Sequence, residues 1–272
     1  MDRFGTDELS GWLRPGDPDR QVLLLHGGPG LSHDYLLPLV EHLPGWTVAS
    51  FQQRGLSPST TSGPFDIPTA VNDVLAVLDR LGWDRPIIAG HSWGGLLAWH
   101  VAVVLGERLG GVLTIDPMGA VGDMELPAFM AELRRRLGPE SVQALAELEA
   151  VEAVRPLDVS EELAGLELLW PSYFADASNV APFEAATMSI EANVSLLGDA
   201  VEHQQTLLER LPGLRVPVGS VVGAGSPIPA SASIDAMALV PGSWVEVVPD
   251  AGHFVWYEQP RSVAAGLDRL LA

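Results

Sequence analysis

Short apolar runs alternate with segments of helical periodicity along most of this chain. Uninterrupted runs of Val, Ile and Leu are typical of parallel strands that helices cover on both faces. Helical patterns lie between them, at residues 68–81, 94–105 and 263–271. This alternation predicts an α/β fold with a mostly parallel central sheet and helices on both of its faces. The runs expected to form strands are residues 22–25, 47–51, 87–89, 112–115, 218–222 and 244–248.

The alternation stops between residues 121 and 215, where helical patterns dominate and no strand is expected. This stretch holds 17 acidic residues and 6 arginines, a net charge of −11. A helical insertion in an α/β sheet is typical of a cap over a site at the carboxyl ends of the strands, and helices packed on the sheet edge are the alternative. We therefore predict a core at residues 1–120 and 216–272, with a helical cap at 121–215. The best helical patterns in the cap are residues 126–137, 141–154 and 196–211.

Composition and charge exclude several kinds of partner and site. The 272 residues include 35 Asp and Glu against 15 Arg and no Lys, and the net charge of −20 disfavours nucleic acid and anionic membranes as partners. The absence of cysteine excludes disulfides, thiolate zinc sites and a cysteine nucleophile. No spacing of histidines and carboxylates suggests a metal site, so we expect neither a metal nor an organic cofactor.

The N-terminal residues are polar and acidic and show no signal-peptide pattern. The longest apolar stretch, residues 96–105, falls well short of the roughly 20 residues that a membrane-spanning helix needs. We therefore expect a cytoplasmic protein without a membrane partner. The sequence leaves the oligomeric state open.

A glycine-flanked serine stands between a predicted strand and a predicted helix, in the segment Gly90-His91-Ser92-Trp93-Gly94. In a G-x-S-x-G nucleophile elbow the turn is so sharp that the residues two before and two after the serine must be very small. The serine hydroxyl then stands clear of the backbone at a helix N-terminus, which favours developing negative charge. The pattern predicts Ser92 as a nucleophile, and a serine that only caps the helix is the alternative.

A glycine-rich loop, His26-Gly27-Gly28-Pro29-Gly30, follows the first predicted strand. A loop in this position supplies one backbone N–H group to an oxyanion hole, and the residue after the nucleophile supplies the other. Glycine lets the backbone approach a substrate carbonyl closely. We therefore predict that the N–H groups of Gly28 and Trp93 form an oxyanion hole. A tight strand-exit turn around Pro29 is the alternative.

The motifs HGGPG and GHSWGG together resemble the α/β-hydrolase superfamily, and most of all its branch of proline iminopeptidases. The likeness extends over residues 22–117 and 216–271 and is not detectable over the cap. A third block, QQRGLSPS at residues 52–59, is similar to the D-Q-R-G-x-G-x-S of that branch, with Gln52 in place of the aspartate and Ser57 in place of the second glycine. The resemblance implies an α/β-hydrolase fold and gives this block a structural role near the site.

The resemblance also implies a general base. Hydrolases of this fold carry their catalytic histidine in the loop after the last strand, where this chain has Gly252-His253-Phe254. We therefore predict that His253 takes the proton of Ser92. Two other histidines, His26 and His91, lie inside the glycine motifs and are expected to shape the pocket.

The acid of a catalytic triad is missing from its usual place. The family carries an aspartate just after the strand expected at residues 218–222, where this chain has Ser226, and a serine cannot stabilise an imidazolium as a carboxylate does. We favour Asp116, which directly follows the preceding predicted strand at the carboxyl edge of the sheet. Asp235 and Asp250 are alternative candidates for the acid, and a third alternative is a site that has no acid.

The leading hypothesis is a serine hydrolase that cleaves a small-molecule ester, amide or related acyl substrate through an acyl-enzyme intermediate. The resemblance implies a narrower alternative, because proline iminopeptidases bind the free amine of their substrates with acidic cap residues; a charged helical module is more often a solvated face. A non-hydrolytic ligand-binding or pathway protein is a second alternative, which Ser226 supports. Ser92 disfavours the aspartyl-nucleophile dehalogenases and epoxide hydrolases, and a cofactor-free perhydrolase would use the same triad.

Aromatic cap residues such as Phe129 and Tyr173 either line an apolar pocket or pack in the core.

Overall fold

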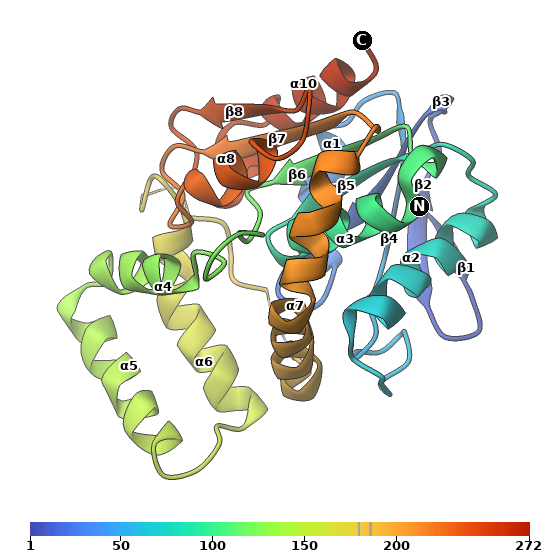
Figure 1. Cartoon of the computed structure of the whole chain (residues 1–272). Coiled ribbons are helices and arrows are strands. Elements are labelled where there is room, and N and C mark those ends of the chain that lie inside the picture. The colour runs from blue at the N-terminus through green and yellow to red at the C-terminus, as the bar shows by residue number, and fades with distance from the viewer. Residues whose placement is uncertain (179, 185–186) are drawn as a thin grey trace.

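The computed structural model describes residues 1–178, 180–184 and 187–272, and its centre is an eight-stranded sheet. The strand order is β1-β2-β4-β3-β5-β6-β7-β8 (Figure 1). Pairs β1–β2 and β2–β4 are antiparallel, and every other neighbouring pair is parallel. The predicted α/β fold with a mostly parallel sheet is therefore confirmed. The strands are β1 (Asp2–Gly5), β2 (Ser10–Arg14), β3 (Asp17–Leu25), β4 (Trp46–Phe51), β5 (Ile87–His91), β6 (Gly111–Ile115), β7 (Val218–Gly223) and β8 (Trp244–Val248).

The six apolar runs of the sequence correspond to β3 through β8, whereas the N-terminal strands β1 and β2 were not predicted. These two strands lie at one edge of the sheet, and β1 is exposed or half-buried along its whole length. Such strands carry no continuous apolar run, because only parallel strands between two helix layers are buried on both faces. The sequence pattern therefore identifies the centre of this sheet and not its antiparallel edge.

Helices cover both faces of the sheet, and alternate residues of β3 show how the core divides. Leu23 and Leu25 pack in one apolar cluster with α2, α3 and α7, while Val22 and Leu24 pack in the other with α1, α9 and α10. Helix α3 is buried over most of its length, as its almost wholly apolar sequence predicts. The helices of the core are α1 (Leu37–Glu41), α2 (Ile67–Leu81), α3 (Trp93–Leu105), α8 (Ser231–Met237), α9 (Val255–Glu258) and α10 (Ser262–Leu270), with 3₁₀ turns η1 (Asp34–Leu36) and η2 (Gly106–Arg108).

The described residues between β6 and β7 form helices and no strand, in agreement with the helical insertion expected there. Helices α4, α5 and α6 project from the core, with α5 and α6 side by side, whereas α7 packs against α2 and α3 (Figure 1). The boundaries 121–215 of a separate cap domain stay a prediction. The elements are α4 (Leu126–Arg135), α5 (Pro139–Glu152), α6 (Val159–Leu169), η3 (Trp170–Tyr173), α7 (Ile190–Arg210) and η4 (Leu211–Gly213).

Helix α6 was not predicted, although the sequence carries a start signal for it. The side chain of Asp158 accepts hydrogen bonds from the N–H groups of Ser160 and Glu161, and the Glu161 side chain bonds back to the Asp158 N–H. This capping box satisfies N–H groups that the first turn of a helix leaves free. Over the described residues, none of the helices combines the length and apolar character of a membrane span.

Candidate active site

Ser92 lies at the turn between β5 and α3, with φ 54° and ψ −120°. A positive φ is rare for a residue with a side chain, and it is retained only where the surrounding structure enforces it. The flanking glycines show why: a Cβ on Gly90 would lie 2.0 Å from the carbonyl oxygen of Gly94, and a Cβ on Gly94 would lie 2.2 Å from that of Leu25. The local geometry is therefore that of the predicted nucleophile elbow.

The glycine-rich loop after β3 lies directly against Ser92, because a Cβ on Gly27 would be 2.8 Å from the Ser92 Cβ. The Gly27 N–H donates to the Tyr35 hydroxyl at 2.5 Å. By contrast, no acceptor among the described residues takes the N–H of Gly28 or of Trp93. These two backbone donors, in the segments that contain and adjoin Ser92, therefore have no acceptor among the described residues.

Several side chains hold this loop in place, and sequence reasoning missed two of them. Gln53 donates to the His26 carbonyl at 2.9 Å and accepts the indole N–H of Trp93 at 3.1 Å. From the cap, the Asn193 amide on α7 donates to the Pro29 carbonyl at 2.9 Å. The glutamine belongs to the QQRGLSPS block, so the sequence did carry a signal for it, while Asn193 had none.

The loop after β8 brings His253 to the end of β6, where Asp116 lies. His253 Nδ1 and Asp116 Oδ2 are 2.7 Å apart, and the two side chains are 3% and 1% exposed. The alternative acids Asp235 and Asp250 are both exposed and make no hydrogen bond to His253. The structure therefore brings Asp116, and neither alternative, against the predicted base.

Asp116 receives two further hydrogen bonds. The Ser226 hydroxyl donates to Oδ2, and the Gly223 N–H donates to Oδ1 at 3.3 Å. Burial raises the pKa of Asp116, and these two bonds oppose the rise because they stabilise the carboxylate. Burial lowers the pKa of His253, so its imidazole is uncharged at neutral pH, as a general base requires. Ser226, at the usual acid position, is thus a partner of the carboxylate.

A buried hydrogen-bonded path connects the glycine loop to the histidine loop, and its central tyrosine was also missed. Tyr35, which accepts the Gly27 N–H, donates its hydroxyl hydrogen to His91 Nδ1 at 2.8 Å. His91 Nε2 in turn lies 3.1 Å from the carbonyl oxygen of His253, and this arrangement requires the Nε2–H tautomer of His91. His91 therefore joins the two loops, a more definite role than the expected shaping of a pocket.

The cap covers His253. The rings of Tyr173 and Phe129 lie 5.3 and 6.2 Å from the His253 ring, and the Tyr173 carbonyl accepts the His253 N–H at 2.7 Å. The Ser92 hydroxyl makes no hydrogen bond to any residue that the structure describes. Catalytic hydrogen bonds are often long or absent before substrate binds and tighten only in the substrate complex.

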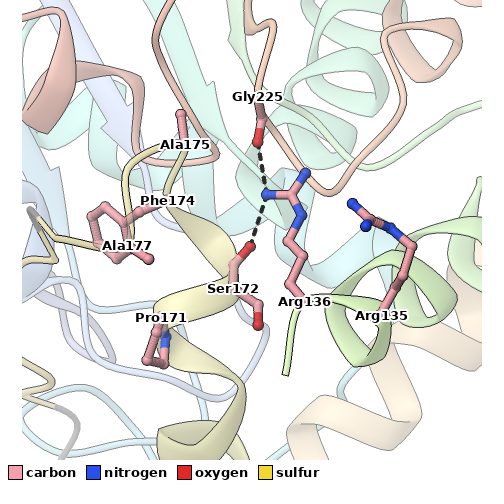
Figure 2. Close-up of a pocket in the computed structure, with 8 residues that line it drawn as sticks. All are labelled: Arg135, Arg136, Pro171, Ser172, Phe174, Ala175, Ala177 and Gly225. Carbon is pink, nitrogen blue, oxygen red and sulfur yellow. Dashed lines mark hydrogen bonds between the residues drawn. The ribbon is translucent and has the colours of Figure 1, made fainter. Parts of the chain in front are cut away.

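A cavity of about 380 Å³ lies beside this closed region and is lined by cap and core residues, but not by Ser92 or His253. Figure 2 shows Arg136 at its wall, between Gly225 and Ser172. The cap carboxylate Glu132 pairs with Arg135 and Arg136, and no described cap carboxylate makes a hydrogen bond or ion pair to His253. In residues 1–178, 180–184 and 187–272, no group of three or more acidic or histidine side chains is arranged to hold a metal ion.

The chain is similar in sequence to a known family and to several characterised proteins. The profile of the alpha/beta hydrolase family matches residues 22–266, which includes the cap interval. A proline iminopeptidase of Elizabethkingia meningoseptica is 29% identical over 180 residues, covering 64% of this chain and 54% of that protein. Epoxide hydrolase B of Mycobacterium tuberculosis is 31% identical over 168 residues, covering 58% of this chain and 41% of that protein. The matched region thus spans about half or less of the length of these relatives.

Solved structures match over nearly the whole chain. VinJ superposes with a TM-score of 0.73 at 23% identity, covering 99% of this chain and 97% of VinJ. Proline iminopeptidase from Mycobacterium smegmatis superposes with a TM-score of 0.70 at 20% identity, covering 99% and 98%. At these identities the likeness establishes the fold alone.

Proposed function

The chain belongs to the α/β-hydrolase family, and on that premise we propose that it is a serine hydrolase whose triad is Ser92, His253 and Asp116. The observation that carries the proposal is the buried contact of 2.7 Å between His253 Nδ1 and Asp116 Oδ2. The Ser92 elbow and the two unoccupied N–H donors of Gly28 and Trp93 support it, because they adjoin the same loops.

The reaction follows from the roles that these groups can take. His253 Nε2 removes the Ser92 hydroxyl proton as Oγ bonds to the substrate carbonyl carbon, and the N–H groups of Gly28 and Trp93 stabilise the oxyanion. The bond to the leaving group then breaks, and that group receives the proton from His253. Water then loses a proton to His253 as it attacks the acyl carbon. The bond between that carbon and Ser92 Oγ breaks, Oγ takes the proton back from His253, and the acid is released. Asp116 orients the imidazole and stabilises the imidazolium.

We propose a small, apolar acyl group for the substrate, in an ester or amide. Two aromatic rings, Phe129 and Tyr173, face His253 from the cap, whereas no described cap carboxylate makes a hydrogen bond or ion pair to it. A proline iminopeptidase activity is the second candidate, favoured by the name of the relative from Elizabethkingia meningoseptica and by the cap charge of −11. An epoxide hydrolase activity, which the name of another relative suggests, is disfavoured because this chain has Ser92 at the elbow in place of an aspartyl nucleophile.

A fluorophosphonate probe, which reacts with activated serines, tests the proposal. We expect the folded wild-type protein to be labelled and Ser92→Ala to be unlabelled. Ser160→Ala, which alters an exposed cap serine, is the matched control and should label like the wild type. Absence of labelling in folded wild-type protein would favour the non-hydrolytic ligand-binding alternative.

A substrate screen separates the two hydrolase candidates. Nitrophenyl esters of acyl chains of increasing length are compared with proline nitroanilide, both at pH 7.5. Turnover of the esters alone supports the acyl hydrolase, with the preferred chain length reporting the space beside Phe129 and Tyr173. Cleavage of the anilide at a rate comparable to the best ester would favour the iminopeptidase.

A further inference from the structure

Arg136, which directly follows α4, bonds to two separate segments: the 3₁₀ turn η3, which is itself in the cap interval, and the loop after β7. Its Nη1 donates to the carbonyl oxygens of Ser172 at 3.0 Å and Gly225 at 2.8 Å, and its Nη2 donates to that of Ser226 at 3.3 Å. Figure 2 shows the guanidinium between Gly225 and Ser172. The Nε atom bonds to Glu132, one turn back on α4, at 2.8 Å. One planar guanidinium therefore fixes the end of α4 relative to η3 and to the loop after β7, because it carries several donors in a rigid fork.

The same two segments, η3 and the loop after β7, also contact the proposed base and acid. Tyr173, next to Ser172, accepts the backbone N–H of His253. Ser226, whose carbonyl Arg136 binds, donates its hydroxyl to Asp116 Oδ2, the atom that also contacts His253 Nδ1. Arg136 is thus two contacts from His253 on one side and two contacts from Asp116 on the other, without touching either.

The direction of the Ser226 hydroxyl is determined by its neighbours. Its oxygen accepts the N–H of Ile228 at 3.0 Å, so its own hydrogen is left to point at Asp116. The Ser226 N–H donates to the carbonyl of Gly223, whose N–H in turn donates to Asp116 Oδ1. The last residue of β7 and the loop after it therefore contribute two hydrogen-bond donors to the carboxylate, at the place where the family's usual pattern would have the carboxylate itself.

We propose that Ser226 and Arg136 are positioning residues of this site: Ser226 orients the Asp116 carboxylate, and Arg136 ties η3, which contacts His253, to the loop after β7, which contacts Asp116. The inference rests on the proposed serine hydrolase function. It makes the geometry of the acid–base pair depend on how the cap interval packs on the core, since Arg136 bonds from that interval to the loop after β7. Both residues act through Asp116 and His253 and neither touches the reacting atoms.

Around His253 and Asp116, few other groups can change their protonation state over the pH range of a rate profile. His91 lies 4.4 Å from His253 between ring centroids, and burial keeps its pKa well below the ordinary value. Tyr173 faces His253 from η3, and burial raises its pKa. Phe129, which faces His253 from α4, carries no ionisable group. The acidic limb of a rate profile therefore belongs to the His253–Asp116 pair.

Ser226→Ala removes a hydrogen-bond donor from the carboxylate, and Ser226→Thr keeps it. We expect kcat/KM on a nitrophenyl ester to fall about tenfold in the alanine variant and to recover within about threefold in the threonine variant. The apparent pKa of the acidic limb should rise in the alanine variant, because a carboxylate with fewer donors binds the imidazolium proton more tightly. A loss of rate without a shift of the limb would show a merely structural role and overturn the inference for Ser226.

Arg135 provides a matched control for Arg136. Both arginines are at the end of α4, bond to Glu132 and line the same cavity, but the Arg135 side chain is 70% exposed and its described hydrogen bonds go to Glu132 alone. We expect Arg136→Gln to lower kcat by about tenfold or more with a smaller change in KM, and Arg135→Gln to stay within twofold of wild type. Equal effects of the two substitutions would overturn the role of Arg136.

A second readout does not require catalysis. The proton between His253 Nδ1 and Asp116 should give a low-field NMR resonance, assigned by its absence in His253→Gln. We expect this resonance to shift in Ser226→Ala and Arg136→Gln and to be unchanged in Arg135→Gln. If the wild-type protein hydrolyses no ester, the proposed function fails while the resonance still tests the positioning. If both variants keep the wild-type resonance, the inference is overturned whatever the rates.

Discussion

At the scale of single residues, Ser92 and Asp116 share an unusual property: both have a positive φ, 54° and 42°. Each directly follows a parallel strand, β5 and β6, which are neighbours in the sheet. Such conformations cost on the order of 1–3 kcal/mol for a residue with a side chain, and they cluster where the structure must aim a functional group. The backbone thus turns both side chains toward the same edge of the sheet as His253.

Asp116→Asn tests the acid at this scale. We expect kcat on a nitrophenyl ester to fall by about 10⁴, because an amide cannot stabilise the imidazolium or select the correct tautomer of His253. Asparagine tolerates a positive φ, so the thermal unfolding temperature should change little. Asp235→Asn and Asp250→Asn are the controls, since both residues are exposed, and each should keep wild-type activity. Activity near wild type in Asp116→Asn, with a loss in either control, would identify a different acid.

At the scale of elements, helix α7 belongs to the cap interval but packs on the core, where its first turn holds the glycine loop. The Ser189 N–H, which precedes α7, bonds to the carbonyl of Gly30 at 2.8 Å, and Asn193 bonds to that of Pro29. Gly30 has no room for a side chain there, because a Cβ would lie 2.3 Å from the Ser189 carbonyl oxygen. The position of the proposed oxyanion donor Gly28 therefore depends on a helix that lies far away in the sequence.

Asn193→Ala tests this dependence. We expect kcat/KM on a nitrophenyl ester to fall about fivefold, since the loss of one hydrogen bond of about 1 kcal/mol loosens the loop that carries Gly28. Val194→Ala, on the same turn of α7 with a side chain 64% exposed, is the control and should leave the rate unchanged. Equal rates in the two variants would show that α7 does not position the oxyanion loop.

At the scale of the whole molecule, buried histidines couple folding to pH. His26 is fully buried, with Nε2 accepting the N–H of Gln53 and Nδ1 facing the carbonyl of Gly27, so its neutral form is the one that fits. Burial lowers the pKa of His26 to about 3 and that of His100 to about 4. In the unfolded chain both titrate near 6.5. The unfolded state therefore binds more protons between about pH 4 and 6.5, and the folded state is penalised as pH falls through that window.

Urea unfolding at pH 7.5 and pH 5.0 measures this penalty. We expect the free energy of unfolding to be lower at pH 5.0, by about 2 kcal/mol for each of these two histidines. His100→Gln should reduce the difference between the two pH values by the share of one histidine, even if its stability at pH 7.5 also changes. An unfolding free energy that is equal at both pH values would contradict the assignment of neutral buried histidines.

Local rules explain what the sequence by itself determined. The apolar runs of β3 through β8, the sharp turn around Ser92 and the glycine loop at residues 26–30 all follow from period, residue size and backbone freedom within a few neighbouring positions. A Cβ at Gly90 or Gly94 would collide with backbone in the turn, so the glycines of the motif are required by the geometry of the turn itself. The acidic, cysteine-free composition also limits the kinds of site that the chain can form, because it supplies no thiolate.

Only the tertiary structure decided which groups meet around His253. Three aspartates were open from the sequence, and Asp116 is the one in contact because β6 and β7 are adjacent parallel strands that end at the same edge. That adjacency also brings Ser226 to Asp116 across 110 positions. The links through Tyr35 and Arg136 are of the same kind: each joins segments far apart in the chain, and no local pattern encodes a contact that exists only after the sheet and cap have packed.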